Sequence, residues 1–239
     1  MNIQSDGREK EKTEQNIPKC IGVILDGNRR WARENGLPDF EGHRRGYTTL
    51  KAFLGWARGV GVENVIVYAF STENWHRAEE EVNGLFGLFR AVFEDILSEA
   101  LHEETRLYFL GDIERLPEDI QKSITRAEDE TNHFQTRRLG VALSYGGRAE
   151  ILAAIKKMAP DDIGGMTEEK FSQLLYTRDF PDPDMIIRTS GEQRLSNFLP
   201  WQSVYSELFF TPTCWPAFTK EEFYTILGTF SQRKRRRGK

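Results

Sequence analysis

The stretch from Cys20 to Arg33, CIGVILDGNRRWAR, constrains the fold of this chain more than any other. Its apolar run, residues 21–25, predicts a buried strand that stops at Asp26-Gly27-Asn28 and gives way to a helix-compatible segment. Such a turn favours anions, because its backbone N–H groups and the positive end of the helix dipole face the ligand. Gly27 would also let the backbone come close to a phosphate. The stretch therefore predicts a phosphate site.

Asp26 is unusual in a phosphate site, because a carboxylate and a phosphate repel each other. A hard cation between them removes the conflict, and Mg²⁺ is commonly held by one carboxylate together with phosphate oxygens and waters. Asp26 therefore predicts a magnesium ion as cofactor. The alternative interpretation is that residues 26–28 form only a turn, where Asp and Gly are common for their backbone preferences.

Length and composition indicate one folded domain without disulfides. The chain has 239 residues, a net charge of −4 and two cysteines, Cys20 and Cys214. Two cysteines cannot form a disulfide framework, and Cys20 opens a buried strand, so we expect reduced thiols and a cytoplasmic location. The negative charge argues against general nucleic-acid binding. No apolar run approaches the roughly 20 residues of a membrane span, so we expect a soluble protein or one that contacts a membrane peripherally.

The two ends of the chain differ from its middle. Residues 1–16 are polar and without periodicity, which predicts a disordered leader, and residues 17–232 are expected to form the folded domain. Residues 233–239, RKRRRGK, form a basic tail. A solvated charge run is the simplest interpretation of that tail.

Strands and helices are predicted to alternate through the domain. Further apolar runs predict strands at residues 65–70, 106–110, 139–144, 185–187 and 208–210. Helical periodicity predicts helices at residues 47–58, 79–103, 117–132, from the turn at 145–148 to about 158, 167–176 and 218–230. This order predicts a single α/β domain with a mostly parallel six-stranded sheet flanked by helices. The polar clusters that follow several strands would then share one sheet edge, where such folds bind ligands.

Two further segments carry functional information. Arg188 and Arg194 flank a Ser/Thr/Gly-rich turn after the fifth strand, and their guanidinium groups would suit a phosphate or diphosphate, although a solvated loop is the alternative. The predicted helix at 79–103 has a broad face rich in Phe. That face could be ordinary core or the wall of an apolar cavity.

Several motifs in this chain resemble those of the cis-prenyltransferase family of the undecaprenyl diphosphate synthase type. They are DGNRRWA, GHRRG, YAFSTENWHR, SYGGRAEI and IIRTSGEQRLSNFLPWQSVYSELFF, and the resemblance extends over about residues 17–238. It implies a prenyl transferase that condenses isopentenyl diphosphate onto an allylic diphosphate such as farnesyl diphosphate, with Mg²⁺. The product would be a cis-polyprenyl diphosphate, of undecaprenyl carrier-lipid type or of short or medium length. The resemblance also implies a hydrophobic product tunnel and a homodimer.

The resemblance assigns roles to individual residues. Asp26 matches the essential, metal-associated aspartate, and Glu207 matches a second carboxylate associated with Mg²⁺. Asn74 matches the residue proposed to help remove the proton, although Asp26 or a diphosphate oxygen could take it instead. The allylic diphosphate loop and its neighbours correspond to Gly27, Asn28, Arg29, Arg30, Trp31 and His43.

The remaining assignments concern three other segments. The loop after the second strand would contact substrate through Ser71, Thr72, Glu73, Trp75 and Arg77, in addition to Asn74. The isopentenyl diphosphate pocket would contain Arg188, Arg194 and Ser196. Arg236 and Gly238 match an Arg-x-Gly ending that reaches across the dimer toward that pocket, so part of the basic tail is expected to be functional.

Some positions depart from the family pattern. Arg29 stands where many bacterial members have Gly. Asp39 lies where some relatives have a basic residue, so a diphosphate contact there would be absent or supplied by Arg44 or Arg45. Arg137 and Arg138 enter the fourth strand where apolar residues would line the far end of the tunnel, which leaves the product length open.

Two other classes of function were weighed against this prediction. A non-catalytic partner subunit of a prenyltransferase would be expected to lack the Asp26 carboxylate or the arginine pair, and this chain keeps both. A nucleotide or sugar-phosphate transferase on a similar sheet would be expected to carry a glycine-rich nucleotide motif such as G-x-x-x-x-G-K-[ST]. The chain has no such motif.

Overall fold

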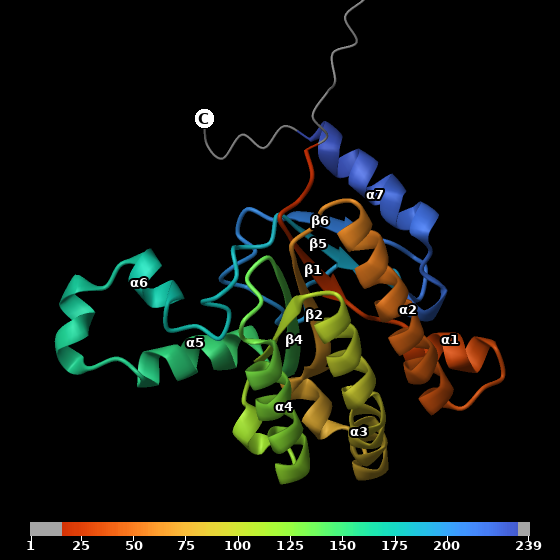
Figure 1. Cartoon of the computed structure of the whole chain (residues 1–239), viewed down its shortest axis with the longest axis horizontal. Helices are drawn as coiled ribbons and strands as arrows, with labels where there is room; N and C mark the ends of the chain where they lie inside the picture. The colour runs from red at the N-terminus through yellow and green to blue at the C-terminus, as the bar shows by residue number, and fades with distance from the viewer. Residues whose placement is uncertain (1–15, 234–239) are drawn as a thin grey trace, which may run out of the picture.

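The computed structural model describes residues 16–233, and its centre is a six-stranded sheet in which all paired strands run parallel (Figure 1). The strand order is β3-β4-β2-β1-β5-β6. The bounds are β1 (Cys20–Ile24), β2 (Asn64–Ser71), β3 (Thr105–Leu110), β4 (Arg137–Tyr145), β5 (Met185–Arg188) and β6 (Glu207–Phe210). Each strand lies within two residues of a predicted one at either end, so the predicted sheet is confirmed.

Helices connect the strands. Their bounds are α1 (Asn28–Glu34), α2 (Asp39–Gly59), α3 (Glu79–His102), α4 (Glu118–Thr131), α5 (Gly147–Lys156), α6 (Glu168–Ser172) and α7 (Lys220–Gln232). Short 3₁₀ turns include η1 (Thr72–His76) and η4 (Trp215–Ala217). No helix within residues 16–233 has the length and apolar character needed to span a membrane.

The predicted start of the second helix is wrong. The sequence placed it at residue 47, after a glycine-containing lead-in, but α2 begins at Asp39 and includes both Gly42 and Gly46. These glycines allow a close approach to α1 and do not break the helix. A Cβ atom on Gly42 would lie 2.0 Å from the backbone oxygen of Asn28, and one on Gly46 would lie 2.2 Å from the Asn28 Oδ1 atom.

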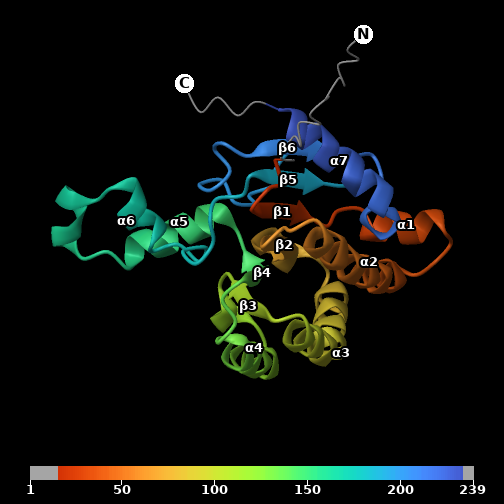
Figure 2. The same cartoon turned by 45° about the horizontal axis from the view of Figure 1, so that its top comes forward.

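The strands bury both faces of the sheet, as their nearly continuous apolar sequences predict. On one face, Ile21 and Val23 belong to a large core with apolar side chains of α2, α3, α4 and α7. On the other face, Cys20 and Ile24 pack with Phe198 and with other residues that lie before and after β5. Figure 2 shows α3 and α4 beside the β3–β4 side of the sheet, with α5 and α6 extending away from it.

The order of the strands shows at which edge of the sheet a ligand would be expected to bind. From the interior strand β1, the chain continues to β2 on one side, and β5 flanks β1 on the other side. The chain segments that follow β1 and β5 therefore leave adjacent strands at a topological switch point, where α/β sheets commonly bind ligands. Asp26 follows β1 there, and Arg188 ends β5.

Candidate active site

Asp26 and Arg188 form an ion pair at this switch point. The Arg188 NH2 group donates to the Asp26 Oδ2 atom at 2.7 Å. The Arg188 NH1 group donates to the Ser196 Oγ atom at 2.8 Å and to the Arg194 carbonyl oxygen at 2.5 Å. The Arg188 side chain is only 4% exposed, whereas that of Asp26 is 35% exposed. A buried guanidinium, hydrogen-bonded through all three of its nitrogens, thus fixes a carboxylate that still faces the cavity.

The Asp26-Gly27 turn is held against the segments that follow β5 and β6. The Asp26 carbonyl oxygen accepts hydrogen bonds from Thr189 Oγ1 at 2.7 Å and from the Trp215 backbone N–H at 2.9 Å. Gly27 has a φ of 99°, and a Cβ atom there would lie 2.9 Å from Cys214 and Ser190 side-chain atoms. Glycine is therefore required both by the left-handed backbone and by the close packing. The turn therefore packs together with the loops after β5 and β6 and is not an isolated surface turn.

Arginines gather at this edge, each with a partner. Arg29 donates from Nε to Asp39 at 3.0 Å and from NH1 to Glu81 at 2.8 Å. Arg77 donates to the same Glu81 oxygen at 2.8 Å. Arg33 forms an ion pair with Asp39 at 2.8 Å, with Nε 2.9 Å from the other carboxylate oxygen.

Asp39 lies where some relatives have a basic residue, and the structure shows which other arginines stand near the site. Arg30 donates from NH1 to the Ser190 carbonyl oxygen at 2.8 Å. Neither Arg44 nor Arg45, one of which was expected to supply the diphosphate contact if it is not absent, lines the cavity described below within residues 16–233, whereas Arg33 does. Arg44 instead pairs with Glu41 at 2.7 Å.

The loop after β2 is tied to its neighbours through side chains. The Asn74 Oδ1 atom accepts from the Ser71 N–H at 3.0 Å, and the Glu73 Oε1 atom accepts from Asn197 Nδ2 at 3.0 Å. The Trp75 Nε1–H donates to the Ser144 Oγ atom at 3.0 Å. The Asn74 carboxamide oxygen is therefore already used to close η1.

His43 is a buried imidazole beside these groups. Burial and the nearby Arg77 guanidinium lower the pKa of His43 to about 4, so the ring is neutral at pH 7. Its Nε2 atom is buried without a hydrogen-bond partner among the described residues. A neutral imidazole with one unused nitrogen can donate to or accept from a bound ligand.

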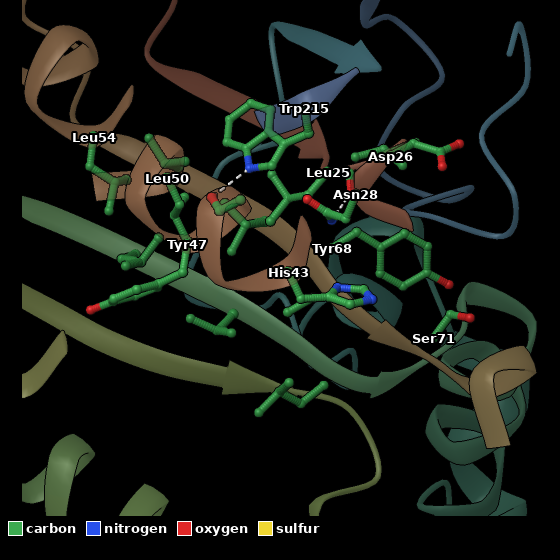
Figure 3. Close-up of a pocket in the computed structure, with 18 of the residues that line it drawn as sticks. Leu25, Asp26, Asn28, His43, Tyr47, Leu50, Leu54, Tyr68, Ser71 and Trp215 are labelled. Atoms are coloured by element: carbon green, nitrogen blue, oxygen red, sulfur yellow. Dashed lines mark hydrogen bonds between the residues drawn. The ribbon is translucent and has the colours of Figure 1, made fainter. Parts of the chain in front are cut away.

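The polar edge opens into a cavity of about 1210 Å³. In Figure 3, Asp26, His43 and Ser71 lie on one side of the view, and Leu50 and Leu54 of α2 lie on the other. Leu85, Phe89 and Phe93 of α3 line the opposite wall. The cavity extends along the strands to the first residues of β4, Arg137 and Arg138.

The far end of the cavity is charged. The Arg58 guanidinium pairs with the Glu103 carboxylate at 3.0 Å, and the Arg137 NH1 group donates to the Glu103 carbonyl oxygen at 2.9 Å. Arg138 donates to the Asn64 Oδ1 atom at 3.3 Å. The β4 end of the cavity is thus bounded by polar groups that are ion-paired or hydrogen-bonded.

Most predicted site residues meet in this cavity. Its lining includes Asp26, Gly27, Asn28, Arg29, Arg30, His43, Ser71, Glu73, Asn74, Arg77, Arg188 and Ser196. Trp31, Thr72, Trp75 and Arg194 lie in neighbouring positions and do not line it within residues 16–233. Arg236 and Gly238, like most of the predicted leader and basic tail, lie outside the described residues.

Glu207 does not join Asp26 within one chain. Glu207 begins β6 and pairs in register with Met185, the first residue of β5, whereas Asp26 follows the end of β1. The two carboxylates therefore lie at opposite ends of the parallel strands, and Glu207 forms an ion pair with Arg233. In the part of the chain that the structure describes, no cluster of three or more His, Cys, Asp or Glu side chains could hold a metal. A magnesium ion at Asp26 would therefore depend on ligand oxygens and waters, which is the coordination that Mg²⁺ commonly accepts.

Sequence analysis missed several lining residues, among them Arg33, Tyr68, Arg148 and Asn197. Asn197 accepts from the Arg148 N–H at 2.9 Å, which joins two of the recognised motifs. Both residues lie inside those motifs and could have been found there. Tyr68 is the first residue of the motif YAFSTENWHR, and its hydroxyl group lies 3.1 Å from the Tyr145 carbonyl oxygen. Tyr68 could therefore have been found from its motif as well, although its place in an apolar strand is equally typical of core.

The fold and the site together define a class of protein. Guanidinium groups, a fixed carboxylate and a tight Gly27 turn stand at the carboxyl edge of a parallel sheet, directly beside a large cavity with apolar walls of α2 and α3. This combination suits amphiphilic diphosphates, whose charged head needs arginines and whose tail needs apolar walls.

Comparison with known families agrees with that class. The sequence model of the family described as putative undecaprenyl diphosphate synthase matches residues 24–238. The chain therefore belongs to this family of prenyl transferases, as the motifs predicted.

Curated relatives and solved structures cover most of the chain. A tritrans,polycis-undecaprenyl-diphosphate synthase (geranylgeranyl-diphosphate specific) of Picrophilus torridus is 45% identical over 230 residues, which cover 93% of this chain and 90% of that protein. An isoprenyl transferase of Fusobacterium nucleatum is 44% identical, covering 94% of this chain and 97% of that protein.

Two solved structures share the fold. Lavandulyl diphosphate synthase from Lavandula x intermedia, in complex with dimethylallyl diphosphate, superposes with a TM-score of 0.88 at 32% identity, covering 93% of this chain and 99% of that chain. A probable undecaprenyl diphosphate synthase from Campylobacter jejuni gives a TM-score of 0.78 at 33% identity, covering 94% and 100%.

Proposed function

We propose that this protein condenses isopentenyl diphosphate onto an allylic diphosphate and releases a cis-polyprenyl diphosphate of the undecaprenyl type. The observation that carries the proposal is the Asp26–Arg188 pair at the open end of a 1210 Å³ cavity with an apolar wall. Farnesyl diphosphate is the expected primer. The relative from Picrophilus torridus is named as specific for geranylgeranyl diphosphate, so both primers belong in the test.

The two diphosphates would bind on the two sides of the switch point. The Gly27 turn with Arg30 and Arg77 would hold the allylic diphosphate, and Arg188 and Ser196 would hold isopentenyl diphosphate. Placing the alkene of one substrate against the allylic carbon of the other supplies the proximity that a bimolecular reaction lacks. As the allylic C–O bond breaks, the guanidinium groups would stabilise the charge that develops on the leaving diphosphate.

Asp26 would hold Mg²⁺ together with diphosphate oxygens, and the metal would supply further charge neutralisation at the leaving group. The condensed cation then loses a proton to restore a double bond. The amide oxygen of Asn74 already accepts from Ser71 and is a weak base, so Asp26 and a diphosphate oxygen are better acceptors.

We further propose that the active unit is a homodimer. The edge strand β6 supports it, because Val204 is 70% exposed just before the strand and Leu208 is 36% exposed within it. An exposed apolar strand edge favours pairing with a second surface. Sedimentation analysis of the full chain should give twice the monomer mass, and a monomer at working concentrations would contradict the proposal.

The experiment that tests the function uses purified protein, labelled isopentenyl diphosphate and a panel of allylic primers, with and without Mg²⁺. Chromatography of the products gives both activity and chain length. Products of about eleven units would support the undecaprenyl type, and shorter ones would support the alternative of a short- or medium-chain synthase. A folded protein that incorporates no label with any primer would favour a non-catalytic partner subunit.

Replacing Phe89 or Phe93 with Ala should lengthen the products. Both side chains line the cavity, and Phe93 stacks on Phe109 with ring centroids 5.4 Å apart. Removing either ring would widen the space available to the growing chain, which gains about 0.8 kcal/mol per buried CH₂ group. Product analysis under identical primer conditions measures the change.

Phe86 provides the matched control for these variants. It lies on the same helix and is 4% exposed, but it does not line the cavity formed by the described residues. Phe86→Ala should therefore lower stability by about 3–5 kcal/mol without lengthening products. Unchanged products from active Phe89→Ala and Phe93→Ala variants would mean that α3 is ordinary core.

Replacing Arg137 with Leu should also lengthen the products. An alkyl chain that reaches Arg137 meets charged groups whose hydrogen bonds it cannot replace, so growth beyond this point is unfavourable. Leucine removes the charged group at this one position at the β4 end of the cavity. Arg106→Leu is the control, because Arg106 lies on the neighbouring strand in register with Arg138 and outside the cavity lining of residues 16–233. Equal product lengths in wild type and both variants would contradict the interpretation.

A further inference from the structure

One oxygen atom of Glu81 lies between two arginines of the site. The Glu81 Oε1 atom accepts from Arg29 NH1 and from Arg77 NH1, both at 2.8 Å. Arg29 belongs to α1, Arg77 precedes α3, and Glu81 lies in the first turn of α3. The three side chains are 24–35% exposed, so the cluster is partly shielded from water.

Both arginines line the cavity, and Glu81 does not line it within the described part of the chain. Arg29 also donates from Nε to Asp39, so two of its donor positions are held by carboxylates. A carboxylate oxygen bridging two guanidinium groups occupies the kind of position that a phosphate oxygen takes in charge-assisted hydrogen bonds. Without Glu81, Arg29 and Arg77 would face each other as like charges.

We propose that Glu81 is a resident counter-anion, which a diphosphate oxygen displaces from Arg29 and Arg77 when substrate binds. The inference rests on the proposed function, because it concerns the diphosphate site at the cavity mouth. Competition from Glu81 weakens diphosphate binding, and its return to the arginines favours departure of the released diphosphate. The same exchange breaks and restores the tie between α1 and α3, the helix that walls the cavity.

The chain contains a matched pair of glutamates for the test. Glu80 lies next to Glu81 in the first turn of α3, is exposed and shares the favourable interaction with the helix dipole. Glu80→Gln and Glu81→Gln therefore remove the same formal charge from the same helix end. Only Glu81→Gln removes the bridge between Arg29 and Arg77.

The experiment is calorimetric titration of the full chain with inorganic pyrophosphate, for wild type and both variants, with thermal unfolding as a check of folding. Glu81→Gln is expected to bind pyrophosphate about tenfold more tightly than wild type, the scale of one charge-assisted hydrogen bond. Glu80→Gln should stay within about twofold of wild type, since its charge is exposed. Unchanged or weaker binding by Glu81→Gln would overturn the proposal, because Glu81 would then only hold the arginines in place.

A double-mutant cycle locates the effect. In an Arg29→Gln background, the gain from Glu81→Gln should fall by at least half, since one of the two displaced contacts no longer exists. A full gain in that background would show that pyrophosphate binds elsewhere and would also overturn the proposal. Pyrophosphate binding requires no condensation, so the result is distinguishable from failure of the proposed function: a protein that makes no prenyl product could still show the expected shift.

Discussion

Asp26→Ala should lower kcat by at least about 10²–10³-fold, the scale of one lost electrostatic element of an active site. Asp26 presents its carboxylate to the cavity mouth while Oδ2 is held by Arg188 at 2.7 Å, so removal takes away both the proposed metal ligand and a fixed negative charge. The side chain is 35% exposed and lies beyond the end of β1, so its loss opens no core cavity. Turnover at saturating substrates and Mg²⁺ measures the effect.

Asp26→Asn is the control for shape, because the amide keeps the size of the side chain and loses its charge. Both variants should be folded by thermal unfolding and comparably inactive. Arg188 retains its contacts to Ser196 and Arg194 in either variant, which limits the disturbance. A variant that keeps more than about a tenth of the wild-type rate would exclude the metal role of Asp26.

Arg188→Ala should raise the KM for isopentenyl diphosphate far more than the KM for the allylic primer. The lost charge-assisted contact is worth about 1.5–3 kcal/mol to one substrate, or roughly 10- to 150-fold. The effect should exceed that of Arg194→Ala, because the Arg188 side chain is 4% exposed and that of Arg194 is 61% exposed. Initial rates with each substrate varied in turn separate the two KM values.

Two further variants refine this test. Arg188→Lys keeps the charge without the planar fork that reaches Asp26 and Ser196 together, so it should recover only part of the loss. Arg178→Ala removes an exposed arginine that pairs with Asp179 at 3.6 Å, and its kinetics should match wild type. Equal increases in both KM values for Arg188→Ala would mean that the two diphosphate pockets are assigned wrongly.

Much of the fold could be predicted, because its strands are short apolar runs bounded by turn residues. The polar residues after β1 and β5 followed from the same logic, and Asp26 and Arg188 indeed meet. The start of α2 was missed because Gly42 and Gly46 look like helix breakers locally, and their contact with α1 is a tertiary fact.

Some features of the site could not be predicted for the same reason, because they depend on tertiary contacts. The distance between Asp26 and Glu207 depends on the register of β5 against β6, which no local pattern specifies. The pairing of Arg29 with Asp39 and Glu81 joins three helices and likewise has no sequence signature. Family motifs identified the residue types at the site, but not their partners.

The two loops proposed to bind the substrates are attached to β1 and β5, so the fold sets their spacing independently of the room for the product. These strands are neighbours in one hydrogen-bonded ladder, with Ile24 opposite Arg188, so the spacing between the loops is set by the roughly 4.8 Å separation of paired strands. The room for the growing chain is instead set by how α2 and α3 pack on the sheet, a softer arrangement of side chains. Warming or loosening the protein should therefore broaden the range of product lengths before it disturbs the bond-forming step.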